Sequence, residues 1–287
     1  MPWGDGIPHT RSFSLTDIHD FDQCIFRFLV RHELERKREI DESSPKMCIG
    51  TILDEAIKLY HLSAKNSFDP NYIDFLVRGA VRHIRESVEK KGERSFYYKH
   101  SQYLSEPLIQ QAVDIFKNYY IKLDGKIKKS IGRVGFCEYI FESNSKKVKL
   151  WGGPDTYEEG EDGVPEVADY KYHEDPKKGV LRLDMDLMPK MYMVLSAGDL
   201  LKIGYKKARF VIRQWNNPKD ETLKEEFDLN SLGSVISFLQ SKIEPILENK
   251  KISFCERSFC LACSSEKREE YLNELENLGF VMVKFRS

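Results

Sequence analysis

The stretches that decide the fold are Leu150-Trp151-Gly152-Gly153-Pro154-Asp155 and, further on, Val167-Ala168-Asp169-Tyr170-Lys171. Each is an apolar run that ends in an acidic residue, and the second acid stands two places before a lysine. Residues two apart in a strand face the same side, so Asp169 and Lys171 point together and Tyr170 points away. If the two runs form one hairpin, Asp155, Asp169 and Lys171 converge. Two carboxylates beside a lysine suit a hard divalent cation and a polarised water molecule.

Helical periodicity dominates the chain up to Gly132, and strand-forming runs appear after it. We expect helices over roughly 15–37, from Gly50 to about residue 61, 71–91, 104–124, 187–204, 229–248 and 266–278. Residues 38–49 and 157–165 are expected to be loop and turn. Strands are expected at 135–141, 147–152, 166–171, 208–215 and 280–285. The pattern predicts an α/β fold with a helical part, 1–132, and a sheet-bearing part, 133–287, within one continuous domain.

Composition excludes few functions. The chain has 287 residues and a net charge of -1, so no overall basic character marks it as a nucleic-acid-binding protein, although 45 Lys and Arg could gather on one face. It contains no run of 18 apolar residues and begins without an apolar core of signal-peptide length. We expect no membrane span and a cytoplasmic, reducing environment.

Asp155, Asp169 and Lys171 have an ordinary explanation as well as a chemical one. A D-x-K triplet is common in charged proteins as an ion pair at a strand end. The surrounding sequence favours a catalytic site over an ordinary ion pair. Both acids end predicted strands, Pro154 precedes the first acid, and Glu138 lies one strand earlier. In that interpretation Asp155, Asp169 and the carbonyl of Tyr170 hold a metal ion. Lys171 orients or deprotonates a water, its pKa lowered by the metal and partial burial.

These residues resemble the PD-(D/E)XK nuclease superfamily, and within it the RecB-type branch that includes the CRISPR-adaptation nucleases. The similar segments are 22–28, 50–61, Glu138, 153–155, 169–171 and 188–192. The resemblance implies a restriction-endonuclease-like mixed sheet flanked by helices. The N-terminal helical region, 1–132, would pack on or arch over the site, and 133–287 would form the nuclease core with a C-terminal cysteine segment.

The resemblance also implies an activity: a Mg²⁺- or Mn²⁺-dependent deoxyribonuclease, exonuclease-like on single-stranded or end-bearing DNA. Asp54 and Glu138 would be outer or second-metal ligands, and Tyr192 would line the site. Protein partners in a repair or CRISPR-adaptation complex are implied too. Two departures favour an alternative, a weak or inactive DNA-binding scaffold subunit: Asp54 stands where the family has His, and Met188 where it has Gln. A zinc-bearing helical scaffold unrelated to nucleases is a third interpretation.

Six cysteines are present, and Cys255, Cys260 and Cys263 fall within nine residues. This spacing favours a metal centre over a disulfide framework. The resemblance implies that Cys24 joins these three to hold a four-iron, four-sulfur cluster. Their order, C-x4-C-x2-C, departs from the branch, so zinc and buried free thiols remain alternatives. Cys48 and Cys137 are expected to be small core residues.

Basic residues interleaved with aromatics are candidates for a nucleic-acid surface, because Lys and Arg contact phosphates and aromatic rings stack on unpaired bases. Solvated helix ends and turns are the ordinary explanation for each of them. The two groups are Arg82, Arg85, Lys90, Lys91, Arg94, Tyr97, Tyr98 and Lys99, and then Lys126, Lys128, Lys129 and Arg133.

Overall fold

A computed structural model describes residues 11–36, 39, 43–63, 70–95, 97–123, 127–128, 130–132, 137–143, 146–172, 186–216, 224–255 and 260–283. The chain divides into two compact units built from interleaved segments. Unit 1 contains 1–42, 137–152 and 233–287, and unit 2 contains 43–136 and 153–232. One crossing between the units lies close to the expected boundary after residue 132. The other crossings, after residues 42, 152 and 232, had no counterpart in the sequence analysis.

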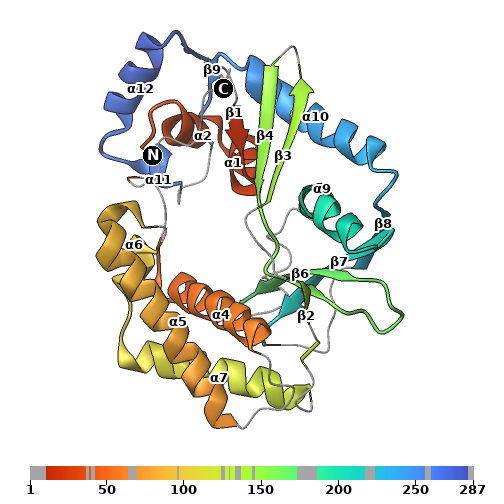
Figure 1. Ribbon diagram of the computed structural model, residues 1–287. Helices are drawn as coiled ribbons and strands as arrows, with labels where there is room; N and C mark the ends of the chain where they lie inside the picture. Colours follow the sequence, from red (N-terminus) through yellow and green to blue (C-terminus); the bar gives the residue numbers. More distant parts are fainter. Residues whose placement is uncertain are drawn as a thin grey trace. The chain divides into compact units, whose positions relative to one another are not determined.

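Unit 2 is built on a five-stranded mixed sheet with the order β2-β5-β6-β7-β8 (Figure 1). Its strands are β2 (Ser130–Gly132), β5 (Thr156–Glu158), β6 (Glu166–Lys171), β7 (Lys207–Gln214) and β8 (Lys224–Asp228). The central pair, β6 and β7, is parallel, with Lys171 opposite Gln214, and the other pairs are antiparallel. This mixed sheet with flanking helices confirms the expected α/β class.

Helices cover both faces of this sheet. They are α4 (Pro45–Leu62), α5 (Pro70–Lys91), η1 (Gly92–Arg94), α6 (Tyr98–Ser101), α7 (Glu106–Lys122) and α9 (Leu187–Lys202). Helices α4, α5 and α7 share one buried core with Ala168, Tyr170, Val211 and Trp215 of the sheet. On the opposite face, Tyr192 of α9 stacks on Phe210 of β7 at 5.7 Å between ring centroids. The helices between residues 45 and 122 therefore contribute to the core of unit 2.

Aromatic packing joins α7 to the sheet. Trp215 is 1% exposed, and its ring centroid lies 4.9 Å from Tyr119, 5.0 Å from Phe116 and 5.1 Å from Tyr170. Large aromatic side chains contribute most of the apolar area that a core removes from water. This cluster fixes Tyr170 into the core, so the neighbouring Asp169 and Lys171 must point to the other face of β6.

The start of α4 corrects one prediction. The sequence analysis placed 38–49 in a loop and began the helix at Gly50, but α4 begins at Pro45. Ser44 is its N-cap and accepts a hydrogen bond from the Met47 amide through its hydroxyl. Serine at the N-cap followed by proline in the first turn is a standard start for a helix. The extra turn places Asp54 and Lys58 in the middle of a stable helix.

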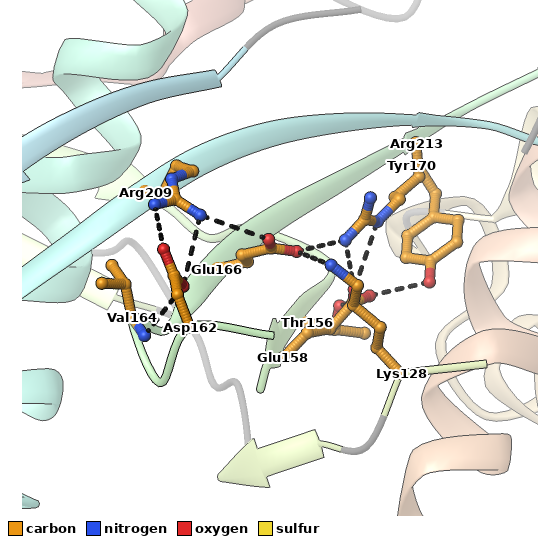
Figure 2. Close-up of polar contacts among 9 residues, drawn as sticks. All are labelled: Lys128, Thr156, Glu158, Asp162, Val164, Glu166, Tyr170, Arg209 and Arg213. Atoms are coloured by element: carbon orange, nitrogen blue, oxygen red, sulfur yellow. Dashed lines mark hydrogen bonds and ion pairs between the residues drawn. The ribbon is translucent and has the colours of Figure 1, made fainter. Parts of the chain in front are cut away.

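A buried ion-pair network involves the side chains of Tyr170 and Arg213, which lie opposite each other in the register of β6 and β7 (Figure 2). Arg213 bonds Glu158 at 3.0 Å and also pairs with Glu166, and all three side chains are at most 5% exposed. Glu166 accepts from Lys128 at 2.7 Å, and Glu158 accepts from the Tyr170 hydroxyl at 2.7 Å. Because every buried charge has an opposite partner here, the cost of burying it is offset. The network therefore ties β5, β6 and β7 together.

Unit 1 holds the remaining strands and helices. Its three-stranded sheet has the order β1-β4-β3, and a short parallel pair joins β9 to β10. The elements are β1 (Arg11–Phe13), α1 (Leu15–Gln23), α2 (Ile25–His32), β3 (Cys137–Ser143), β4 (Lys146–Gly152), α10 (Gly233–Glu248), β9 (Lys251–Ile252), α11 (Leu261–Ser264), α12 (Arg268–Asn277) and β10 (Val281–Met282).

The expected hairpin between the two opening stretches is wrong. Strand β4 pairs with β1 and β3, whereas β6 pairs with β5 and β7. Gly152, with φ of 144°, and Pro154, which has no N–H to donate, end β4 before the chain enters β5. Strand β5 lies in a stretch predicted to be a turn, and it is β5 that brings Asp155 to β6.

The expected single helix over 15–37 is two helices, α1 and α2, interrupted at Cys24. Cys24 has extended backbone angles, φ -162° and ψ 102°, and its sulfur accepts from the Arg27 amide at 3.4 Å. It thereby caps α2, a role that a residue inside a continuous helix could not have.

Among the described helices none combines the length and apolar character that crossing a membrane requires.

Candidate functional site

Asp169 and Lys171 lie side by side near the carboxyl end of β6. Lys171 Nζ is 2.5 Å from Asp169 Oδ2, and the two side chains are 37% and 3% exposed. Burial alone would lower the pKa of Lys171, but the adjacent Asp169 carboxylate raises it well above its ordinary value. Lys171 is therefore a fixed cation at neutral pH. The expected lowering of this pKa depended on a bound metal ion as well as on burial, so it stays a prediction.

Asp155 joins this pair through the backbone. Its amide donates to the Ala168 carbonyl at 3.0 Å, which extends the β5–β6 ladder by one residue. One oxygen of its carboxylate accepts from the Tyr170 amide at 2.7 Å. Burial, followed by the charge of Asp169, raises the pKa of Asp155 to about 6. In a strand the N–H and C=O of one residue point to the same side, so the Tyr170 carbonyl also points toward Asp155.

Asp54 belongs to the same cluster although it comes from α4. Burial raises the pKa of Asp54 well above its ordinary value, and the charges of Asp155 and Asp169 add to this effect. Lys171 and Lys58 act in the opposite direction. These interactions require proximity, so Asp54 is not the exposed helical acid that was its ordinary explanation. Helix α4 thus adds a third carboxylate to the two from the sheet.

Tyr192 reaches the cluster from α9. Its hydroxyl hydrogen-bonds Asp169, and burial together with that carboxylate raises the pKa of Tyr192 well above its ordinary value. Met188 lies one turn earlier on the same helix and is 5% exposed. Tyr192 therefore acts as a neutral hydrogen-bond donor that orients Asp169, and Met188 is part of the apolar packing.

Two further residues, Lys58 and Glu55, were missed in the sequence analysis. Both lie on α4 next to Asp54, and Lys58 Nζ is 3.1 Å from Glu55 Oε1. Lys58 follows Asp54 by four residues, a spacing that puts both on one helix face. This spacing was visible in the sequence but was outweighed by the commonness of charged helix surfaces.

Glu138 is placed differently from the other acids. It lies on β3 in unit 1, where its carboxylate pairs with Lys149 at 3.0 Å. Its assignment as a metal ligand stays a prediction.

The acidic cluster carries more carboxylates than cations. Asp54, Asp155 and Asp169 outnumber Lys171 and Lys58, and the raised pKa values of Asp54 and Asp155 show that the cluster resists full ionisation. Such a surplus of buried oxygen ligands is what a divalent cation neutralises.

The four cysteines singled out in the sequence gather in unit 1. Cys24 Sγ lies 3.5 Å from Cys263 Sγ and 3.8 Å from Cys260 Sγ, and Cys255 Sγ lies 3.8 Å from Cys263 Sγ. All four sulfur atoms are within 4.8 Å of one another. Hydrogen bonding to Cys260 is the main cause that raises the pKa of Cys24 to about 12, whereas the thiols of Cys24 and Cys263 lower the pKa of Cys260. When four thiols lie this close together, few of them can lose their protons, because the thiolate charges would repel one another. A cation bound among them removes this limit.

The four-sulfur geometry can be tested against the two expected centres. A tetrahedral ion with zinc–sulfur bonds of about 2.3 Å holds its ligands about 3.8 Å apart. A four-iron cluster holds its thiolates farther apart, because iron and sulfide atoms lie between them. The observed separations match the single ion. Cys48, buried in the core of unit 2, and Cys137, buried on β3, lie outside the group, as expected.

The structure describes only some of the residues predicted to form a nucleic-acid surface. Arg82, Arg85, Lys90, Lys91 and Arg94 are exposed on α5 and η1. Lys128 is instead part of the ion-pair network of Figure 2, where it bonds Glu166. Lys126, Lys129 and Arg133 lie outside the described residues.

Solved structures with some similarity to this chain include SSO0001, at 15% identity, a TM-score of 0.27 and coverage of 76% of this chain and 93% of that one. Rai1 from Scheffersomyces stipitis, solved with (3'-NADP)+ and a calcium ion, shares 10% identity, with a TM-score of 0.21 and coverage of 79% and 60%. Rai1 from Candida albicans, solved with pU5 and Mn²⁺, shares 11% identity, with a TM-score of 0.19 and coverage of 79% and 62%. No curated protein matches the chain.

One family model spans residues 12–268, from β1 to the start of α12, and therefore includes Asp54, the whole β5–β6 site and all four clustered cysteines. That match, over most of the chain, agrees with the mixed sheet and with the acids and lysine at the end of β6. The chain belongs to the PD-(D/E)XK nuclease superfamily.

Proposed function

We propose that this protein is a metal-dependent deoxyribonuclease whose site is formed by Asp155, Asp169 and Lys171, with Asp54 as a further ligand. The observation that carries the proposal is the meeting of three carboxylates around Lys171, two of them with raised pKa values. Asp155, Asp169 and the Tyr170 carbonyl would hold Mg²⁺ or Mn²⁺. When bound, the ion would polarise the phosphate and an attacking water.

The residues of the chain then have separate tasks. Lys171, a permanent cation, orients the attacking water and offsets negative charge that develops on the phosphate. Tyr192 fixes Asp169 by hydrogen bonding, and the Tyr170 amide fixes Asp155. Asp54 supplies an oxygen ligand where related nucleases carry His. From the RecB-type resemblance we further propose single-stranded or end-bearing DNA as substrate and a protein partner in repair or CRISPR adaptation.

The proposal is tested by incubating the protein with labelled single- and double-stranded DNA in Mn²⁺, Mg²⁺ or EDTA. We expect metal-dependent cleavage that drops at least about 100-fold in Lys171→Ala and Asp169→Asn, since each removes a group that contacts the reacting phosphate or its metal. Lys202→Met, an exposed lysine on α9, is the control and should cleave as the unaltered protein does. DNA binding without metal-dependent cleavage would support the scaffold alternative instead.

For the four cysteines we propose one structural zinc ion, because the sulfur separations match a tetrahedral site. The iron–sulfur cluster implied by the family resemblance is the competing centre. Anaerobically purified protein should be colourless and contain one zinc per chain. A broad violet-blue absorption band with bound iron would refute zinc in favour of the cluster.

A further inference from the structure

Lys58 has a position that the roles of Lys171 and the carboxylates do not use. It lies on α4 four residues after Asp54, so it stands one turn along the same helix face. Its side chain is 45% exposed, whereas that of Asp169 is 3% exposed. Lys58 is therefore a cation beside the acidic cluster that is open to solvent.

Lys58 is held in place by a supporting acid. Its ammonium group lies 3.1 Å from Glu55 Oε1, and the Glu55 side chain is only 14% exposed. Glu55 in turn hydrogen-bonds the hydroxyl of Tyr97, a half-buried residue that precedes α6. An ammonium group has three donors, and Glu55 takes one of them. The Tyr97–Glu55 contact thus restrains the lysine while leaving donors for another acceptor.

The charge of Lys58 is felt inside the site. Lys58 interacts electrostatically with Asp155 and Asp54 as well as with Glu55, so its ammonium group lies close to these carboxylates. Lys171 lies 2.5 Å from Asp169 and is assigned to the scissile phosphate, so a contact to the next phosphate needs a different cation. A polyanionic strand that presents one phosphate to the carboxylate-bound ion carries further phosphates on either side of it. Among the described residues, Lys58 is an exposed cation one helical turn from Asp54 that is in a position to contact one of them.

We propose that Lys58 is a substrate-binding residue whose ammonium group contacts a non-bridging oxygen of a phosphate next to the scissile one. This inference rests on the proposed nuclease function and extends it with a named contact to the DNA backbone. Because the contact is to phosphate, it contributes to affinity for any sequence and depends on salt.

The test is the affinity of the full chain for a fluorescent single-stranded oligonucleotide in EDTA, where no cleavage occurs. Lys58→Met should weaken binding by about 5-fold or more at about 0.1 M salt and reduce the slope of log affinity against log salt by about 0.7. Lys58→Arg should keep that slope. In Mn²⁺, Lys58→Met should raise KM and leave kcat within about 3-fold.

Lys202→Met is the matched control. Lys202 is 79% exposed and pairs with Asp199 three residues earlier, just as Lys58 pairs with Glu55, but it lies ten residues beyond Tyr192, about 15 Å along α9. Tyr97→Phe, which loosens Glu55 without removing a charge, should weaken binding by less than Lys58→Met. Thermal melts of all variants verify folding, and Lys58→Arg with Tyr97→Phe test the proposal if Lys58→Met does not fold.

Each contrary result has its own meaning. Equal DNA affinity and salt slope in Lys58→Met and Lys202→Met would overturn the proposal for Lys58. So would tighter Mn²⁺ binding with unchanged DNA affinity, because Lys58 would then only balance the carboxylates. Lost affinity in Lys58→Met without any metal-dependent cleavage by the unaltered protein would refute the nuclease and retain the phosphate contact. An unaltered chain that binds no DNA would overturn both.

Discussion

At the scale of single residues, the site is defined by the partners that hold each of its charged side chains. Asp169 lies against Lys171 and Tyr192, and Asp155 is bound to the Tyr170 amide. Burial and the neighbouring acids raise the pKa values of Asp54 and Asp155, so both carboxyls hold their protons more tightly than in an unfolded chain. Binding of a divalent cation must therefore release protons.

This coupling predicts a pH-dependent effect of Mg²⁺ on stability. The pKa of Asp155 is raised from the value of about 3.9 for an unfolded chain to about 6. Its contribution to stability is thus fully present below about pH 4 and is lost as pH rises through about 6. Mg²⁺ needs the ionised carboxylate, so it should raise the melting temperature more at about pH 7.5 than at about pH 5.

Mg²⁺ is the probe because it prefers oxygen ligands, so the cysteine group does not take it up. Differential scanning calorimetry at both pH values gives the two shifts. Asp155→Asn should abolish most of the difference, since the amide does not titrate. Equal shifts at the two pH values in the unaltered protein would contradict the coupling.

At the scale of elements, the pair β6–β7 connects the site to a structural network. Tyr170 is the link, because its amide bonds Asp155 while its hydroxyl bonds Glu158 of the network in Figure 2. The geometry of Asp155 therefore depends on how rigidly β5 and β6 are held. Helices α4 and α9 add Asp54 and Tyr192 from opposite faces of the same sheet.

Arg213→Met should destabilise unit 2 strongly, by about 3–5 kcal/mol, because the buried Glu158 would lose its cationic partner while Glu166 would keep only Lys128 and the more distant Arg209. Arg78→Met is the matched control: Arg78 is 43% exposed and also contacts two acids, Asp74 and Glu106. Exposed pairs contribute about 1 kcal/mol or less. Urea unfolding compares the two variants, and losses of similar size would show that the network does not stabilise the sheet.

At the scale of the whole molecule, each unit is assembled from distant parts of the chain. Cys24 meets Cys255, Cys260 and Cys263 in unit 1, and α4 meets β6 in unit 2. Contacts between residues far apart in sequence are costly in loop entropy and slow to form. A metal ion held by Cys24 and the C-terminal cysteines, as proposed above, would offset part of that cost.

Loss of the cysteine-bound metal should therefore lower the stability of unit 1. Cys24→Ala should reduce bound zinc or iron to well under one equivalent and destabilise the protein by about 3 kcal/mol if the ion is present at about 100-fold its Kd. Cys48→Ala, which removes a buried thiol in unit 2, should keep the metal. Metal analysis with thermal melts measures both, and unchanged metal content in Cys24→Ala would rule out its role as a ligand.

The sequence by itself determined what depends on near neighbours. The alternation along β6 placed Asp169 with Lys171, helical periodicity located α5, α7 and α9, and the cysteine spacing indicated a metal group. The family resemblance assigned Asp54, Tyr192 and Cys24 to sites with these residues, and their roles there stay predictions. The start of α4 was also legible in Ser44 and Pro45, although the sequence analysis assigned both to a loop.

Only the tertiary structure decided which strands pair and which charges meet. Periodicity states that a segment is a strand but not which strand lies beside it, because partners are chosen by long-range packing. Hence the sequence could not separate β4 from β6, reveal β5 as the strand that delivers Asp155, or show that Lys58 and Glu55 join Asp54. The break between α1 and α2 at Cys24 also needed the tertiary structure, because the Cys24 sulfur lies beside the sulfur atoms of cysteines near the other end of the chain.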